Sequence, residues 1–118
     1  MVQAVCEIPR RLRERDDVSF LGCLALTGYL DAPDSLTVPS LVAELSRSPS
    51  LVEEWLNYSG DKRVTSGWAF ERTRDGGAVI AWFPRGERIT FGDPVRACAE
   101  FIVRELRDLH ARMREAGR

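Results

Sequence analysis

The chain has 118 residues, of which 44% are hydrophobic and 30% are charged, and its formal net charge is -1. This composition is typical of a folded globular protein and excludes a disordered chain. A net charge close to zero provides no overall attraction to nucleic acid or to an anionic membrane. We expect one α+β domain over residues 1–118, a size at which a hydrophobic core folds unaided.

Three cysteines, Cys6, Cys23 and Cys98, are widely spaced and odd in number. The sequence holds no CxxC pair, so it predicts neither a zinc site nor a redox motif, and we expect no metal and no cofactor. Reduced thiols and the lack of a signal-peptide pattern predict a cytoplasmic protein. The longest apolar run, residues 18–30, is shorter than the about 20 residues that cross a bilayer, and we interpret it as a buried helix.

The first fifteen residues are ambiguous. Residues 2–5 fit either a short edge strand or a loose lead-in, and we expect poor order at 1–15 and at 115–118. Asp16 or Asp17 is placed to cap the helix that follows, because either carboxylate can accept from the amides of the first turn. Apolar residues cover a wide arc of that helix, which predicts that most of its surface is buried.

Two further helices are predicted in the first half of the chain. The first covers residues 38–47 and is entered through Pro39, since proline is favoured in the first turn. The second begins at Ser50, where Ser50 and Glu53 have the spacing of a capping box. It should end near Gly60, because glycine readily adopts the left-handed conformation that terminates helices.

From Ser66 the apolar period changes from helical to alternating, which indicates strands. The sequence predicts strands over 68–72, 78–83 and 88–91, with turns at 74–77 and 84–87. The middle strand is almost continuously apolar and is therefore expected at the centre. Together these segments predict a three-stranded antiparallel β-meander.

Asp93 and Pro94 begin the most clearly predicted helix, because Asp is a favoured cap and Pro a favoured first residue. Apolar side chains recur along it at steps of three and four, and we expect this face to pack across the sheet. The residues are Val95, Cys98, Ala99, Ile102, Leu106, Leu109 and Met113. The predicted fold is thus N-terminal helices, a β-meander and a long C-terminal helix on the sheet.

No catalytic constellation is complete in the sequence. A nucleophile needs a base within hydrogen-bond reach, and His110 is twelve residues from Cys98, roughly 18 Å along a helix axis. The adjacent acids at 16–17 and at 53–54 diverge on a helix and do not share a proton. No glycine-rich loop has phosphate-binding spacing. We therefore expect a protein without enzymatic activity.

Residues 55–68 combine aromatic, glycine and charged residues at a predicted helix-to-strand junction. Tyr, Trp and Arg dominate binding hot spots, because they desolvate a large area while keeping a polar end. We predict the partner-binding residues here, namely Tyr58, Asp61, Lys62, Arg63 and Trp68. In the alternative interpretation, Trp55 and Trp68 anchor the core, and the charged residues form a solvated loop in which Asp61 pairs locally.

Three runs of this half of the chain match a pattern found in small bacterial proteins. Residues 58–63 match a "YS-x-DKR" loop, 67–70 a "GW-aromatic" strand, and 91–94 an "F-x-D-P/A" helix start. Over residues 55–104 the chain resembles small uncharacterised bacterial α+β proteins, a build that is common among immunity proteins that neutralise toxins. The resemblance implies another protein as the partner, such as a toxin encoded nearby. Inhibitors of nuclease toxins are commonly very acidic, and this chain is not, so a basic nuclease is not implied.

Three functions fit these features. The first is a non-enzymatic protein-binding domain, an immunity-type inhibitor that acts by steric occlusion. The second is a winged-helix DNA-binding regulator, although its recognition helix would carry the acids at 53–54 and no base, which opposes contact with phosphates. The third is a small-molecule sensor whose pocket is lined by Trp68, Phe70, Trp82 and Phe83. We expect no membrane and no nucleic acid among the partners, and the edge strands or the last helix would allow a homodimer.

Overall fold

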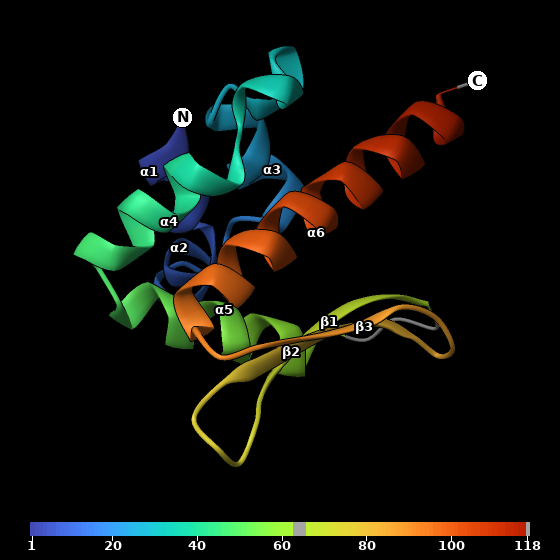
Figure 1. Cartoon of the computed structure of the whole chain (residues 1–118). Coiled ribbons are helices and arrows are strands. Elements are labelled where there is room, and N and C mark those ends of the chain that lie inside the picture. Colours follow the sequence, from blue (N-terminus) through green and yellow to red (C-terminus); the bar gives the residue numbers. More distant parts are fainter. Residues whose placement is uncertain (63–65, 118) are drawn as a thin grey trace.

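The computed structural model describes residues 1–62 and 66–117. The sheet lies on one side of the molecule, α6 crosses it, and most of the N-terminal helices lie on the other side of α6 (Figure 1). The helices are α1 (Val2–Cys6), α2 (Ile8–Glu14), α3 (Phe20–Leu26), α4 (Val38–Arg47), α5 (Ser50–Asp61) and α6 (Pro94–Ala116), with 3-10 turns η1 (Tyr29–Asp31) and η2 (Pro33–Ser35). The strands are β1 (Gly67–Arg72), β2 (Ala78–Phe83) and β3 (Arg88–Phe91). The predicted α+β fold with a long helix on the sheet is confirmed.

The sheet is an antiparallel meander in which β2 is the central strand, as predicted. Phe70 pairs with Ile80 across β1 and β2, and Ile80 pairs with Ile89 across β2 and β3. Paired residues in a ladder lie on the same face of a sheet. On that face Phe70 stacks on Phe101 of α6, with 5.5 Å between the ring centroids, so α6 seals the apolar side of the sheet.

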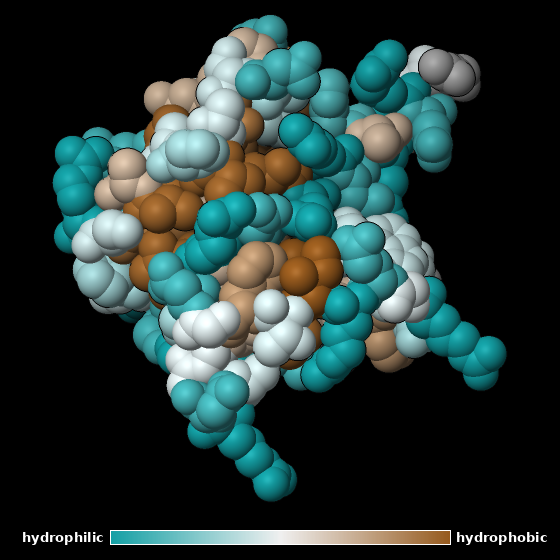
Figure 2. All heavy atoms as spheres, in the orientation of Figure 1, coloured by the Kyte–Doolittle hydropathy of each residue, from teal (hydrophilic) through white to brown (hydrophobic). Residues whose placement is uncertain are grey.

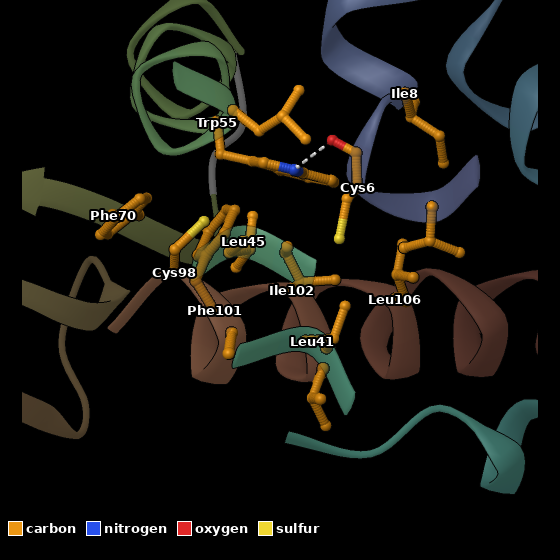
Figure 3. Packing of buried hydrophobic residues seen from close by; sticks show 14 of the residues in the cluster. Cys6, Ile8, Leu41, Leu45, Trp55, Phe70, Cys98, Phe101, Ile102 and Leu106 are labelled. Atoms are coloured by element: carbon orange, nitrogen blue, oxygen red, sulfur yellow. Dashed lines mark hydrogen bonds between the residues drawn. The ribbon is translucent and has the colours of Figure 1, made fainter. Parts of the chain in front are cut away.

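The core lies between α6, the sheet and the N-terminal helices (Figure 3). Trp55 of α5 is fully buried, and its indole Nε1 donates a hydrogen bond to the Cys6 carbonyl at 3.0 Å. Phe101 of α6 packs edge-to-face against the indole, with 6.1 Å between the ring centroids. The largest fully buried side chains are Trp55, Tyr29, Phe70, Phe101, Ile8, Leu24, Leu41, Leu45, Leu51, Ile80, Ile102 and Leu106. Each contributes about 1.5–3 kcal/mol relative to an exposed position.

The N-terminal residues form helices, and the edge strand considered for residues 2–5 is wrong. Val5, Cys6 and Ile8 are fully buried. Residues 5 and 8 are separated by about one helical turn and therefore point to one side, which faces the core. The bond from Trp55 to the Cys6 carbonyl joins α1 to α5. At the opposite end of the chain, α6 continues as far as Ala116.

The caps of the helices differ in part from prediction. Ser19, rather than Asp16 or Asp17, caps α3, and its hydroxyl accepts from the Gly22 amide at 3.0 Å. The predicted capping box at the start of α5 is absent, because Pro49 is the residue in the cap position and Ser50 is already inside the helix, where its hydroxyl accepts from Arg10 of α2. Ser50 is used in a contact with an element that is distant in sequence, which local spacing does not reveal.

α3 is more exposed than predicted. Of its residues only Cys23 and Leu24 are buried, while Leu21 is 44% and Leu26 is 83% exposed. The interpretation of residues 18–30 as a mostly covered helix is therefore wrong. The run is split by Gly28, whose φ of +86° lies in the left-handed region that favours glycine, and the short helix packs on one side only.

The face of the molecule seen in Figure 2 has hydrophobic side chains gathered over α4 and the adjoining part of α6, whereas much of the sheet is covered by side chains of intermediate hydropathy and much of the projecting end of α6 by hydrophilic ones. Among the residues described, no helix has the length and apolar character needed to cross a bilayer.

Candidate functional site

A groove of about 460 Å³ lies between α2 and the second half of α5. Its walls combine apolar side chains of α2 with polar and charged side chains of α5. They are formed by Pro9, Leu12, Arg13, Glu54, Asn57, Tyr58, Asp61 and Lys62. Three of the five predicted partner-binding residues, Tyr58, Asp61 and Lys62, therefore line one concave surface.

An ion pair fixes the two walls of this groove relative to each other. The Arg13 guanidinium contacts the Glu54 carboxylate in a fork, with Nη2 2.7 Å from Oε1 and Nε 3.1 Å from each carboxylate oxygen. Two parallel hydrogen bonds restrict orientation more than a single contact does. The pair lies at the surface, and the hydrogen bond to Glu54 raises the pKa of Arg13. The groove is thus shaped before any partner arrives.

A buried carboxylate lies behind the groove. Glu105 of α6 is only 3% exposed. It accepts a hydrogen bond from the Tyr58 hydroxyl at 2.6 Å and two from the Lys62 ammonium, at 2.9 and 2.8 Å. Burial and the adjacent Glu105 charge raise the pKa of Tyr58 well above its ordinary value, so the hydroxyl remains a donor. These three side chains, which we name the Glu105 cluster, join the end of α5 to α6.

Lys62, which we predicted to bind a partner, is mostly buried. Its side chain is only 12% exposed, and its ammonium contacts Glu105 and lies 5.5 Å from the centroid of the Phe101 ring. Tyr58 is half-buried and stacks on Phe20 of α3. Among these residues Asp61 alone is well exposed. Arg63, which we also predicted to bind a partner, lies outside the described residues.

Trp68 lies apart from the groove, on the face of β1 that α6 covers. Its ring packs edge-to-face against Trp82 at 5.4 Å, and the Arg104 guanidinium lies 5.4 Å from its centroid. The side chain is half-buried. The geometry therefore fits the alternative interpretation, in which Trp55 and Trp68 pack within the fold.

Sequence reasoning missed Glu105, although a signal for it was present. Glu105 follows Phe101 by four residues and precedes Leu109 by four, so it occupies the apolar side of α6. An acid in that position is buried only with a partner, since an uncompensated buried charge is very costly. Its partner Lys62 is 43 residues away, a pairing that no local pattern predicts.

The thiols of Cys6 and Cys98 are poor nucleophiles in this structure. Cys6 and Cys98 are fully buried, and burial raises the pKa of Cys6 to about 12 and that of Cys98 well above its ordinary value. A thiol with a raised pKa is protonated at neutral pH and unreactive.

His110 is half-exposed and packs against Tyr29, with ring centroids 6.2 Å apart. Within residues 1–62 and 66–117, no three His, Cys, Asp or Glu side chains are grouped as metal ligands.

The four aromatic residues proposed for a sensor pocket do not line one common pocket. Phe70 is buried against Phe101, and Trp68 faces α6, whereas Phe83 is 53% exposed. A hollow of about 200 Å³ on the sheet is lined by Phe83 and Trp82 but by neither of the other two.

Comparison with known proteins adds no relative: no family model, curated protein or solved structure matches the chain significantly.

Proposed function

We propose that this protein is a non-enzymatic protein-binding domain of the immunity type, which inhibits its partner by steric occlusion through the groove between α2 and α5. The observation that carries the proposal is the groove itself, which is preshaped and gathers Tyr58, Asp61 and Lys62 on one surface. Concave surfaces with an apolar floor and a few polar groups are preferred binding sites.

The roles of the groove residues follow from their exposure. Asp61 and Asn57 are exposed and are available to contact a partner, while Leu12 and the Tyr58 ring offer partly covered apolar surface. Lys62 acts by positioning Tyr58 and the end of α5 through Glu105. Binding to a preshaped surface avoids the entropy cost of ordering a loop, which favours affinity.

A DNA-binding function has less support. α5, the helix in the recognition position of a winged-helix plan, contains no Lys or Arg. Its acids Glu53 and Glu54 pair with Arg72 and Arg13, so two bases of the surface are already neutralised. Affinity for DNA depends mainly on phosphate contacts by bases.

The proposal is tested by co-expressing the protein with the product of its neighbouring gene and measuring the affinity of the purified complex. Asp61→Arg should weaken binding by about tenfold or more, equivalent to about 1.4 kcal/mol. The change should not disturb folding, because a base at the C-terminal end of a helix interacts favourably with the helix dipole. Glu115→Arg, at the exposed far end of α6, makes the same charge change and should leave the affinity within about twofold.

Absence of a complex with the neighbouring product would count against the proposal, as would equal affinities of the two variants. Clean retardation of duplex DNA at low salt would instead favour the winged-helix function.

A further inference from the structure

The exposed side of α3 is apolar and carries no charge. It consists of Leu21, Gly22, Ala25 and Leu26, which we name the α3 face. Leu26 is 83% exposed and Leu21 is 44% exposed, in a chain whose residues are 30% charged. Contiguous exposed apolar surface on a soluble protein marks an interaction site more often than scattered single residues do.

Local structure accounts for the glycine of this face but not for the leucines. A Cβ at Gly22 would lie 3.1 Å from the Ser19 hydroxyl that caps the helix, so the cap favours glycine there. Leu26 is too exposed to contribute to the core, so the packing of this chain does not require an apolar side chain there. The leucines therefore need an explanation outside the packing of this chain.

Acidic residues precede and follow α3 in the chain, and Arg15 is the base that lies next to them. No Lys or Arg occurs between positions 16 and 46, a stretch that contains Asp16, Asp17, Asp31, Asp34 and Glu44. Asp16 and Asp17 precede α3, Asp31 follows it in η1, and all three are exposed. Arg15 pairs with Asp17 at 3.1 Å, whereas Asp16 and Asp31 form no ion pair with any residue in the ranges 1–62 and 66–117.

We propose that the α3 face docks a partner protein whose contact surface has an apolar centre and a basic rim. Asp16 at one end of the face and Asp31 at the other attract bases on both sides of an apolar contact, which gives charge complementarity. A second copy of this chain does not fit as well, because two such faces would bring like charges together at the rim.

The α3 face adjoins the groove described above. Phe20, the first residue of α3, stacks on Tyr58 of the groove wall with 4.9 Å between ring centroids. One partner can therefore cover both surfaces, which brings the contact area closer to that of a stable complex. The inference rests on the proposed function only for the identity of the natural partner.

The chemistry of the α3 face is tested with a synthetic amphipathic helical peptide that carries a stripe of leucines and lysines at both ends. The peptide is titrated into the isotopically labelled full chain, and amide chemical shifts are followed by NMR. We expect saturable shifts confined to α3 and its flanks. Replacing the peptide lysines with glutamates should weaken binding by about tenfold, and raising the salt from about 0.05 to about 0.5 M should weaken it by about threefold.

Two lysine variants, each at an exposed apolar position, test where the peptide binds. Leu26→Lys should weaken peptide binding by about fivefold or more, and its fold should be intact because the residue is exposed. Phe83→Lys changes another exposed apolar residue, on the sheet, and should leave binding unchanged. Asp31→Lys should reduce the difference between the lysine and glutamate peptides.

Shifts centred on the sheet, equal binding of both peptides or no effect of Leu26→Lys would overturn the inference. A dimer of the protein alone that Leu26→Lys converts to a monomer in sedimentation would also overturn it, by making a second copy the occupant. Loss of peptide binding in Leu26→Lys but not in Asp61→Arg separates this surface from the groove, so the two proposals can fail independently.

Discussion

Glu105 shows how one buried residue can determine the shape of a surface that it does not reach. Its carboxylate receives hydrogen bonds from Tyr58 and Lys62, and both of these side chains line the groove between α2 and α5. The end of α5 is therefore held against α6 by a mostly buried ion pair and a hydrogen bond to the same carboxylate. A residue that acts in this way positions the groove without contacting a partner.

Glu105→Gln should destabilise the protein by about 3 kcal/mol, because the Lys62 ammonium then loses its counter-charge in a site where it is only 12% exposed. The neutral amide still accepts from Tyr58, so the loss reflects mainly the ion pair. Urea denaturation measures the free energy of unfolding. A cost below about 1 kcal/mol would show that water reaches the pair freely.

The double variant Lys62→Met, Glu105→Gln provides the control. With both charges removed, no buried ion is left without a partner, and a hydrophobic side chain of similar length fills the space. Lys62→Met should therefore cost less in the Glu105→Gln background than in the native protein. Equal costs in the two backgrounds would mean that the residues do not interact.

At the scale of elements, the sequence predicted best those features that depend on neighbouring residues. Alternation over 68–72 and 88–91 and the continuous apolar run over 78–83 specified the strands, because one face of the sheet is buried under α6 and 78–83 is the central strand. Asp93 caps α6 as expected, and its carboxylate accepts from the Val95 amide at 2.9 Å. In each case the determining interaction lies within a few residues along the chain.

Features that depend on distant contacts were not predicted. Ser50 has the spacing of a cap, yet its hydroxyl accepts from Arg10, 40 residues away. Lys62 appeared to belong to a solvated loop, yet Glu105 holds it inside. The concave groove was unpredictable for the same reason, since it arises only where α2 packs on α5. Composition therefore drew attention to residues 55–68, but it did not show which of their side chains are exposed and which are buried.

A pair of cap variants tests this distinction between helix starts. Thr37 caps α4 in a reciprocal capping box, so Thr37→Ala should lower the free energy of unfolding by about 1 kcal/mol. Ser50 makes no cap bond to α5 and meets Arg10 at the surface, so Ser50→Ala should cost less than about 0.5 kcal/mol. Urea denaturation of both variants gives the comparison, and equal costs would contradict the assignment of the caps.

At the scale of the whole molecule, buried thiols and a buried phenol, which ionise only at high pH, determine how stability changes in alkali. Burial is the main cause that raises the pKa of Cys6, of Cys98 and of Tyr58. All three groups lie in the region where α1, α5 and α6 meet, and each must be neutral in the native state. In the unfolded chain each ionises at its ordinary value, so alkali draws the equilibrium towards unfolding.

The stability of the protein should accordingly fall as the pH rises from about 9 to about 12. In this window the unfolded Cys6 thiol loses its proton, while the native thiol, whose pKa is about 12, keeps it. The unfolded state then binds fewer protons, and the free energy of unfolding decreases by up to about 1.4 kcal/mol per pH unit for this one group. Urea denaturation between about pH 8 and about pH 11 measures the slope. Cys6→Ala removes the titrating group, so its slope should be smaller even though its stability at pH 8 is lower. Identical slopes in the two proteins would show that Cys6 ionises equally in both states, which is incompatible with a thiol sealed between α1 and the core.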